Sequence, residues 1–257
     1  MFSSCSSAPE PQEALPPAPE PVPVEEPFVE PEALDMDWAG TSWILKDSDK
    51  GRYPGYRGFH LAADGRLLTV GEPLATGDSW KADGNRLRLS LLEGEAGLPM
   101  DGEFMVFPAG EEDGIISAIR LVPADTPRVE GVLLIRARAK VDVVENHWIP
   151  KYLDRGNTVQ WPMSREIHMI LLPDARGGLG ILGYGGENRF RSTVRLGTGV
   201  FSSGPISVSR RQGPATPFEN LYLEQISKTN RYVQIGDDLF LYRDTRLTAA
   251  FRVRLFD

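Results

Sequence analysis

Cysteine, histidine and long apolar runs are scarce in this sequence, and each shortage excludes a class of protein. A single cysteine, Cys5, among 257 residues leaves no partner for an intrachain disulfide and excludes zinc sites built from several cysteines. His60, His147 and His168 show neither H-x-x-x-H nor H-E-x-x-H spacing, so we expect no metal site. No stretch approaches about 18 consecutive apolar residues, the length that indicates a transmembrane helix.

Motifs of common enzymes are missing as well. G-x-S-x-G, which places the nucleophile of an α/β-hydrolase, does not occur. The carboxylate pair Asp237-Asp238 lies in a predicted turn, and Glu111-Glu112 lies in a predicted solvated loop. We therefore expect no catalytic residues, no cofactor and no enzymatic activity. A hydrolase with an unrecognised site would need a cleft with converging polar groups and shifted pKa values.

The charge is unbalanced only near the start of the chain. The sequence has 36 acidic and 28 basic residues, but residues 1–35 hold seven Glu, one Asp and no Lys or Arg. Without those eight, 28 acidic residues face 28 basic ones, so residues 36–257 are neutral overall. This balance argues against a nucleic-acid-binding protein based on bulk positive charge.

The first residues resemble the end of a bacterial lipoprotein signal. In Phe2-Ser3-Ser4-Cys5, an apolar residue and two small ones precede the cysteine that would become lipidated. Phe is unusual at its position, and no basic and apolar regions precede it, so we expect the native precursor to carry an upstream apolar segment. The resemblance implies a lipid anchor at Cys5 in a membrane, expected to be the outer membrane, facing the periplasm. The alternative is a free cysteine in an unfolded tail.

Residues 8–35 are predicted to be a disordered tether. They contain nine Pro and seven Glu with few bulky apolar residues, so they cannot bury enough apolar surface to offset their ordering entropy. Proline keeps such a chain extended, with a reach of about 80 Å at ~3.1 Å per residue. A tether of this kind suits a domain held off a membrane, and it also suits a linker.

Residues 36–140 are predicted to form a small β-barrel-like domain. GFHLAADGRLLTV (58–70) has the pattern of two strands around an Asp64-Gly65 turn, and a second hairpin turns at Asp83-Gly84-Asn85. Leucine alternates with arginine over residues 86–89, so leucine should face a core and arginine the solvent. Residues 130–139 are predicted to form another strand.

Residues 141–257 are predicted to form a second, α+β domain with one helix packed on its sheet. Its predicted strands lie at 166–172, 231–235, 238–242 and 248–255. The predicted fold class is therefore mostly β, with two small antiparallel β-rich domains. Trp43-Ile44 and Trp148-Ile149 open the two units alike, which fits either an old duplication or two unrelated β units; the tryptophans are expected to fill cores.

The helix is predicted in PATPFENLYLEQISKTN (214–230). Thr216 suits the N-cap, Pro217 suits the first helical position, and Glu219 completes a T-x-x-E capping box. The apolar face that should pack on the sheet consists of Phe218, Leu221, Tyr222 and Ile226.

The stretch GGLGILGYGGENRF (177–190) contains G-x-G-x-x-G at Gly178, Gly180 and Gly183. A dinucleotide site needs a helix directly after this string, because the helix N-terminus binds the pyrophosphate. Two further glycines follow at once and would make a poor first helical turn. The string therefore predicts a glycine-bent β-hairpin rather than a nucleotide site.

The order of pieces in the second domain resembles the META domain, the family of the heat-shock protein HslJ. The matching pieces, spread over residues 142–256, are Trp148, GYGGENRF (183–190), ISVSRR (206–211), ENLYL (219–223), RY (231–232) and GDDLFL (236–241). Many members have G-C-N in the loop and a second Cys before the helix. Here Gly186-Glu187-Asn188 and Gln212-Gly213-Pro214 stand instead, so a function that needs this cysteine pair is not expected.

The META resemblance implies an envelope-associated α+β domain, often carried by lipoproteins, with no established enzymatic chemistry. The first domain is similar to lipocalins only in Trp43, Gly58-Phe59 and its Asp-Gly hairpins, and no ligand carries over from that.

Five arginines near the glycine loop are the candidate binding residues. Arg189, Arg191, Arg195, Arg210 and Arg211 would form a basic surface if their strands are neighbours. Such a surface would suit an anion, a polyanionic envelope component or the chain's own acidic tail. The alternative is a set of scattered, solvated arginines.

These patterns predict a non-enzymatic cell-envelope lipoprotein that binds or supports other envelope components. The alternative function is a small-molecule or lipid carrier with a pocket inside the first barrel, since a barrel of about eight strands holds one small ligand.

Overall fold

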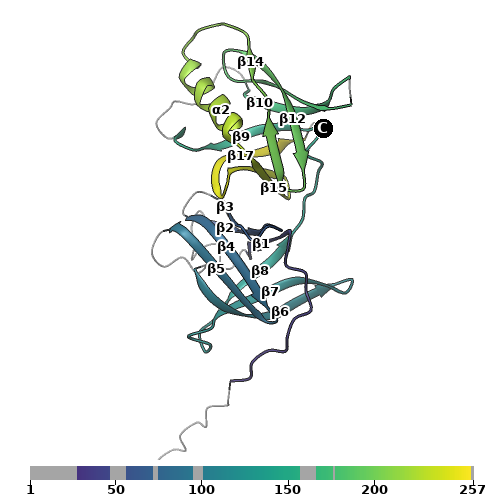
Figure 1. Ribbon diagram of the computed structural model, residues 1–257, viewed down its shortest axis with the longest axis vertical. Coiled ribbons are helices and arrows are strands. Elements are labelled where there is room, and N and C mark those ends of the chain that lie inside the picture. Colours follow the sequence, from purple (N-terminus) through teal and green to yellow (C-terminus); the bar gives the residue numbers. More distant parts are fainter. Residues whose placement is uncertain are drawn as a thin grey trace, which may run out of the picture.

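The structure, a computed structural model, describes residues 28–46, 56–71, 75–94, 101–156, 166–175 and 177–255. Within these ranges the chain forms two antiparallel sheets and one helix, and the two barrel-like units lie end to end (Figure 1). The predicted fold class, mostly β with one helix beside the second sheet, is confirmed. The first sheet ends at Ala137 and the second begins at His147, and the predicted boundary at 140/141 falls in this interval.

The first unit contains eight strands that pair with their neighbours along the chain. They are β1 (Thr41–Leu45), β2 (Tyr56–Leu61), β3 (Leu67–Gly71), β4 (Ala75–Asp83), β5 (Arg86–Gly94), β6 (Gly102–Glu112), β7 (Ile115–Pro123) and β8 (Val132–Ala137). Because β1 pairs with both β2 and β8, the order is β3-β2-β1-β8-β7-β6-β5-β4. The predicted hairpins at Asp64-Gly65 and Asp83-Gly84-Asn85 are confirmed as β2–β3 and β4–β5.

The two edge strands of this sheet, β3 and β4, approach each other and nearly close the barrel. The Trp80 amide donates a 2.9 Å hydrogen bond to the Gly65 carbonyl, and Arg66 bridges Ser79. A Cβ on Gly77 would lie 2.0 Å from the Leu67 carbonyl oxygen, so only glycine permits this approach.

The second unit is a closed ring of eight strands with a ninth at its side. The strands are β9 (His147–Leu153), β10 (His168–Pro173), β11 (Leu179–Tyr184), β12 (Arg189–Gly197), β13 (Val200–Ser203), β14 (Ser207–Val208), β15 (Arg231–Ile235), β16 (Asp238–Arg243) and β17 (Arg246–Arg254). Their order is β11-β10-β9-β17-β16-β15-β13-β12-β14, and β11 also pairs with β12, which closes the ring. The short β14 pairs with β12.

The glycine string forms the predicted hairpin, because β11 and β12 pair from Tyr184↔Arg189 to Leu179↔Val194. Only glycine fits at position 183, because a Cβ there would lie 2.4 Å from the His168 carbonyl oxygen and 2.5 Å from the Phe190 ring. Positive φ occurs at Gly177, at 79°, and at Gly186 in the turn, at 123°. The glycines thus serve close packing and a turn.

The predicted helix is confirmed as α2 (Thr216–Lys228), but its predicted capping box is wrong. The N-cap is Ala215, without a side-chain cap, and the Thr216 hydroxyl instead accepts a 3.0 Å hydrogen bond from the Gly213 amide. Glu219 turns away from the helix start to the glycine loop, whose free amides compete for its carboxylate.

The helix buries the predicted face in the core of the second unit. Phe218, Tyr222 and Ile226 are fully buried there, and Leu221 packs at the edge of this core. In the first unit, Leu87 and Leu89 are buried as their alternation predicted. Tryptophans fill both cores: Trp43 and Trp148 are fully buried, Trp38 nearly so and Trp80 partly, whereas Trp161 lies outside the described residues.

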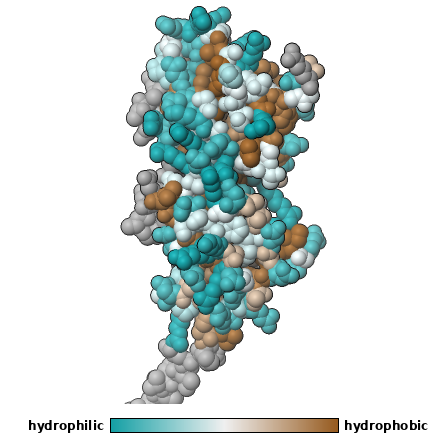
Figure 2. Space-filling view, viewed as in Figure 1, coloured by the Kyte–Doolittle hydropathy of each residue, from teal (hydrophilic) through white to brown (hydrophobic). Residues whose placement is uncertain are grey.

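A third apolar cluster joins the two units. Leu68 and Val70 of β3 pack against Val233 and Phe240 of the second unit, together with Ile235, Tyr242, Leu247 and Ala250. The Tyr242 hydroxyl donates a 2.9 Å hydrogen bond to the Thr69 carbonyl. On the face shown in Figure 2, hydrophilic residues run across the junction. This agrees with an apolar cluster that is buried between the two units.

Residues 28–35 of the predicted tether form no helix or strand, but they contact the first unit. The Asn85 amide donates a 2.5 Å hydrogen bond to the Pro31 carbonyl, and Glu30 accepts one of 2.9 Å from Arg86. Phe28 contacts Phe107 edge to face, and Leu34 packs at the edge of the first core. The rest of the predicted tether and Cys5 lie outside the described residues.

Candidate functional site

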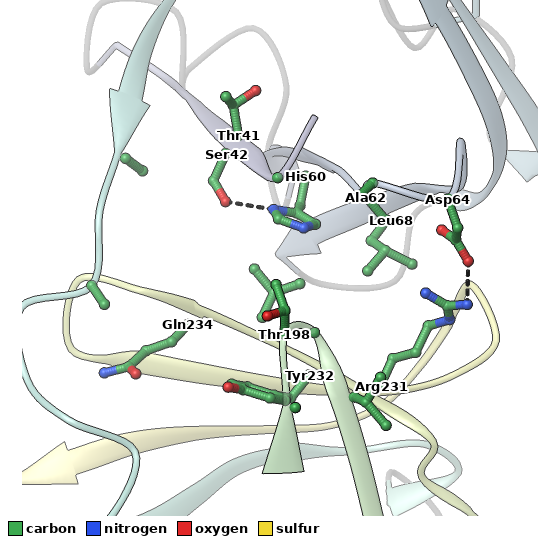
Figure 3. Close-up of a pocket in the computed structure, with 18 of the residues that line it drawn as sticks. Thr41, Ser42, His60, Ala62, Asp64, Leu68, Thr198, Arg231, Tyr232 and Gln234 are labelled. Atoms are coloured by element: carbon green, nitrogen blue, oxygen red, sulfur yellow. Dashed lines mark hydrogen bonds and ion pairs between the residues drawn. The ribbon is translucent and has the colours of Figure 1, made fainter. Parts of the chain in front are cut away.

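A cleft of about 850 Å³ lies between the two units (Figure 3). The first unit contributes the ends of β1 and β2, the β2–β3 turn and the segment 136–139 that leads to the second unit. The second unit contributes the β12–β13 hairpin, residues 196–200, and strand β15. Segments far apart in the sequence therefore form one site.

Ser42 and His60 form a hydrogen-bonded pair on the wall from the first unit. They lie opposite each other in the β1–β2 register, and the Ser42 hydroxyl and the His60 Nδ1 share a hydrogen bond of 2.9 Å. Their neighbours Trp43 and Phe59 point into the first core. Strand alternation therefore directs Ser42 and His60 outward, into the cleft.

The imidazole of His60 is neutral at physiological pH. Burial and, to a smaller extent, the positive charge of Arg231 lower the pKa of His60 from 6.5 to about 4, against a smaller opposing effect of Asp64. A neutral imidazole has one donor and one acceptor nitrogen. With Nδ1 engaged by Ser42, Nε2 is left for a ligand in the cleft.

An ion pair between Asp64 and Arg231 lies at the edge of the cleft. Asp64 stands in the β2–β3 turn, Arg231 begins β15, and their charged atoms lie 2.5 Å apart. Partial desolvation acts to raise the pKa of Asp64, but the hydrogen bond and charge of Arg231 outweigh it, so this pKa lies below its usual value. The pair neutralises itself and links the two units.

Two other arginines, Arg136 and Arg138, border the cleft. Ala137 lies opposite Ser42 on the outward side of the first sheet, whereas Arg136 lies opposite Trp43, whose side chain enters the core. Alternation thus places Arg136 on the inner side of its strand, away from the cleft. Arg138 follows the end of β8 and is exposed. The charges of Asp64 and Arg231 cancel each other within the cleft.

Three polar side chains of the second unit line the cleft with hydrogen-bonding capacity to spare. Figure 3 shows Thr198, Tyr232 and Gln234 across the cleft from Ser42 and His60. Within the described part of the chain, the Thr198 and Tyr232 hydroxyls have no hydrogen-bond partner. Gln234 uses only its amide nitrogen, which donates to the Val141 carbonyl. Desolvation by burial raises the pKa of Tyr232, so its hydroxyl stays protonated.

The Ser42–His60 pair suits binding better than nucleophilic catalysis. A catalytic histidine needs a pKa near the working pH, and a third group usually holds its second ring nitrogen. His60 has a pKa of about 4 and makes no hydrogen bond through Nε2 to any carboxylate among the described residues. The imidazole is therefore a poor base for a serine nucleophile.

The five predicted arginines form a second candidate site, the arginine face, on the outer side of β12 and after β14. Arg189, Arg191 and Arg195 are exposed and alternate with the buried Phe190 and Val194. Arg210 and Arg211, also exposed, follow Ser209 just after the β14 segment that pairs with β12. Arg189 and Arg191 lie at the end of β12 that pairs with β14, and Arg195 lies further along β12, opposite Ser202 of β13.

Buried polar groups hold the two arms of the arginine face together. The Glu219 carboxylate accepts hydrogen bonds of 2.7 and 2.6 Å from the backbone and side-chain amides of Asn188. Asn188 in turn binds the backbone of Arg211, donating 2.9 Å to its carbonyl and accepting 2.7 Å from its amide. Asn188 and Glu219 are both buried, so this network fixes where the arginines emerge.

The first core contains large side chains where a carrier pocket was expected. Trp43, Phe59 and Leu61 are fully buried there. A second hollow, of about 770 Å³, opens at the mouth of this unit beside Phe104 and residues 123–132. Among the described residues, no three His, Cys, Asp or Glu side chains are grouped as metal ligands, and no helix is long and apolar enough to cross a membrane.

Sequence patterns could not reveal the cleft, because its residues come from strands whose pairing and docking no local pattern specifies. Ser42, His60, Thr198 and Arg231 are each ordinary strand or turn residues in the sequence. His60, which stands between the apolar Phe59 and Leu61, was the one available signal. The arginine face was predictable, because its residues lie close together along the chain. The chain matches no protein-family model, no curated protein and no solved structure.

Proposed function

We propose that this chain is a non-enzymatic, lipid-anchored protein of the bacterial cell envelope that binds a polyanionic envelope component through its arginine face. The observation that carries the proposal is five exposed arginines on neighbouring strands. None of the five forms an ion pair with another described residue. Guanidinium groups in this state suit the bidentate binding of phosphate, sulfate or carboxylate groups.

Several other arginines of the molecule are paired with carboxylates, in contrast to the five of the arginine face. Arg57 and Arg252 both bind Asp238, at 2.7 and 2.8 Å. Arg246 binds Asp154, and Arg254 binds Glu166. These four arginines are neutralised by carboxylates, whereas the five of the arginine face are not. Arg88, Arg138 and Arg243 also form no ion pair with a described residue, but they come from separate parts of the fold.

The position of the N-terminal segment suits an anchored protein. Residues 28–38 run along the first unit and leave it at the end remote from the second unit, where β12 and β14 lie (Figure 1). An anchor at Cys5 would hold the first unit nearer the membrane and extend the META-like second unit away from it. We propose the periplasmic side of the outer membrane as the site.

Binding to dextran sulfate, with uncharged dextran as the control polymer, tests the arginine face. We expect the purified chain to bind dextran sulfate with strong salt dependence, because counterions are released. The triple variant Arg189→Gln, Arg191→Gln, Arg210→Gln should bind at least about tenfold more weakly, which corresponds to ~1.4 kcal/mol. The matched variant Arg88→Gln, Arg138→Gln, Arg243→Gln removes the same charge elsewhere and should bind nearly normally. Equal losses in both variants would show a bulk charge effect and refute the proposed face.

The anchor is tested separately in bacterial cells that express the chain behind a lipoprotein signal peptide. We expect fatty-acid label on the protein and its recovery with membranes, and both should be lost in Cys5→Ser. Retention of the variant in the membrane fraction would contradict anchoring at Cys5.

A small-molecule carrier remains the second candidate function, with its pocket in a different place from the one first predicted. The cleft between the units is supported by its volume and polar lining, whereas the first core is filled.

A further inference from the structure

We propose that the cleft between the two units binds a neutral, hydroxyl-rich small molecule of the saccharide class. This site is separate from the arginine face, so either proposal can fail without the other. The volume, about 850 Å³, lies within the range of roughly 300–1,000 Å³ that is usual for small-molecule sites.

The charge of the cleft favours an uncharged ligand. Asp64 and Arg231 neutralise each other at 2.5 Å, and His60 is uncharged because its pKa is about 4. An anion would have to compete with Asp64 for Arg231, and a cation would have to compete with Arg231 for Asp64. The ion pair therefore offers no net electrostatic attraction to an anionic or a cationic ligand.

The hydrogen-bonding groups suit hydroxyls, which both donate and accept. His60 Nε2, the Thr198 hydroxyl and the Tyr232 hydroxyl have no partner in the described part of the chain, and the Gln234 carbonyl oxygen is likewise unused. These groups come from both units and line opposite sides of the cleft (Figure 3). A ring that carries several hydroxyls can satisfy them together, whereas an apolar ligand would leave them desolvated and unpaired.

Apolar groups complete the lining. Leu68, Val200 and Val233 border the same cleft. Saccharides present C–H faces between their hydroxyls, so mixed polar and apolar walls suit them better than they suit a fully polar ion.

The cleft is held in shape before any ligand binds. Leu68 and Val233 belong to the apolar cluster that joins the units, and the Arg231–Asp64 and Tyr242–Thr69 contacts link the same two bodies. Such preorganisation lowers the entropic cost of ligand binding.

Saturation-transfer NMR of the full chain with maltose, lactose and chitobiose tests the proposal, with glucuronate and glucose 6-phosphate as anionic comparisons. We expect a signal from at least one neutral disaccharide and at least a tenfold weaker response from both anions. Thr198→Trp fills the cleft from an exposed hairpin position and should abolish the signal. Ser202→Trp, exposed in β13 of the same hairpin and outside the cleft, should preserve it.

Three results of this experiment would overturn the inference. They are the absence of a signal from all three disaccharides, stronger binding of the anions, and equal loss in Thr198→Trp and Ser202→Trp. Covalent labelling of Ser42 by a fluorophosphonate probe would also overturn it, since it would indicate a serine nucleophile. Dextran sulfate binding should be unchanged in Thr198→Trp, which separates this site from the arginine face.

Discussion

Gly180 and Gly183 belong to the same strand, β11, but differ in the space that surrounds them. A Cβ at Gly183 would lie 2.4 Å from the His168 carbonyl oxygen, whereas one at Gly180 would lie 3.4 Å from its nearest neighbour, the Ser192 carbonyl oxygen. We expect Gly183→Ala to lower the free energy of unfolding by roughly 1–3 kcal/mol through overpacking. Gly180→Ala should change it by less than about 1 kcal/mol. Urea unfolding measures both, and equal effects would refute the packing role assigned to Gly183.

His60 predicts a dependence of stability on pH. Its folded pKa of about 4 lies below the value of 6.5 expected when unfolded, so between these values the unfolded chain binds the extra proton. The free energy of unfolding is therefore undiminished above pH 6.5 and falls as the pH drops toward 4. Between pH 7 and pH 4.5 we expect His60 to account for a loss of about 2–3 kcal/mol.

The measurement compares urea unfolding of the natural chain and of His60→Gln at these two pH values. Between pH 7 and pH 4.5, the free energy of unfolding of the variant should fall by about 2–3 kcal/mol less than that of the natural chain. His147 and His168 also have lowered pKa values, mainly through desolvation, and their contribution is common to both proteins. An identical loss in both proteins would contradict a neutral His60.

Glu219 connects helix α2 to the glycine loop and stabilises the position of each against the other. Its carboxylate accepts hydrogen bonds from the amides of Glu187 and Asn188 at 3.1 and 2.7 Å. We expect Glu219→Gln to cost roughly 1–3 kcal/mol, because its NH₂ group would face either the two backbone amides or the side-chain amide of Asn188, which are all donors. Glu224→Gln on the same helix removes only an exposed pair with Lys228 and should cost less than about 0.5 kcal/mol.

Thermal unfolding of the two variants gives the comparison. Dextran sulfate binding provides a second readout, because Asn188 also holds the backbone of Arg211. Glu219→Gln should weaken this binding and Glu224→Gln should not. Equal stability of both variants would show that the loop does not depend on the helix.

Elements were predictable where a local pattern dictates them. Alternation and Asp-Gly turns gave the β2–β3 and β4–β5 hairpins, and the apolar spacing of Phe218, Tyr222 and Ile226 gave α2. The capping box failed because the loop amides, 31 and 32 residues earlier in the chain, compete for Glu219. A capping rule considers only residues next to the helix start, so it could not predict hydrogen bonds from this distant loop.

The whole molecule depends on the apolar junction between its two units. Leu68, at 2% exposure, packs against the second unit, whereas Leu92 is 63% exposed. We expect Leu68→Asp to bury an unpaired carboxylate and separate the units, so that one calorimetric transition becomes two. Leu92→Asp should leave a single transition. Protease cleavage between residues 138 and 146 should increase only in Leu68→Asp, and unchanged cleavage there would refute a coupled junction.

The sequence alone determined the features that depend on neighbours in the chain. These are the mostly β composition, most strand and turn positions, the helix and its apolar face, and the grouping of the arginines; all of them rest on periodicity, turn chemistry or adjacency. Tertiary structure decided what depends on distant contacts. It closed the ring of strands in the second unit and nearly closed that of the first, packed residues 28–35 on the first unit and brought Ser42 and His60 opposite Thr198 and Arg231. The physical reason is that docking of two units is fixed by side-chain packing across their surfaces, and a one-dimensional pattern does not encode which surfaces meet.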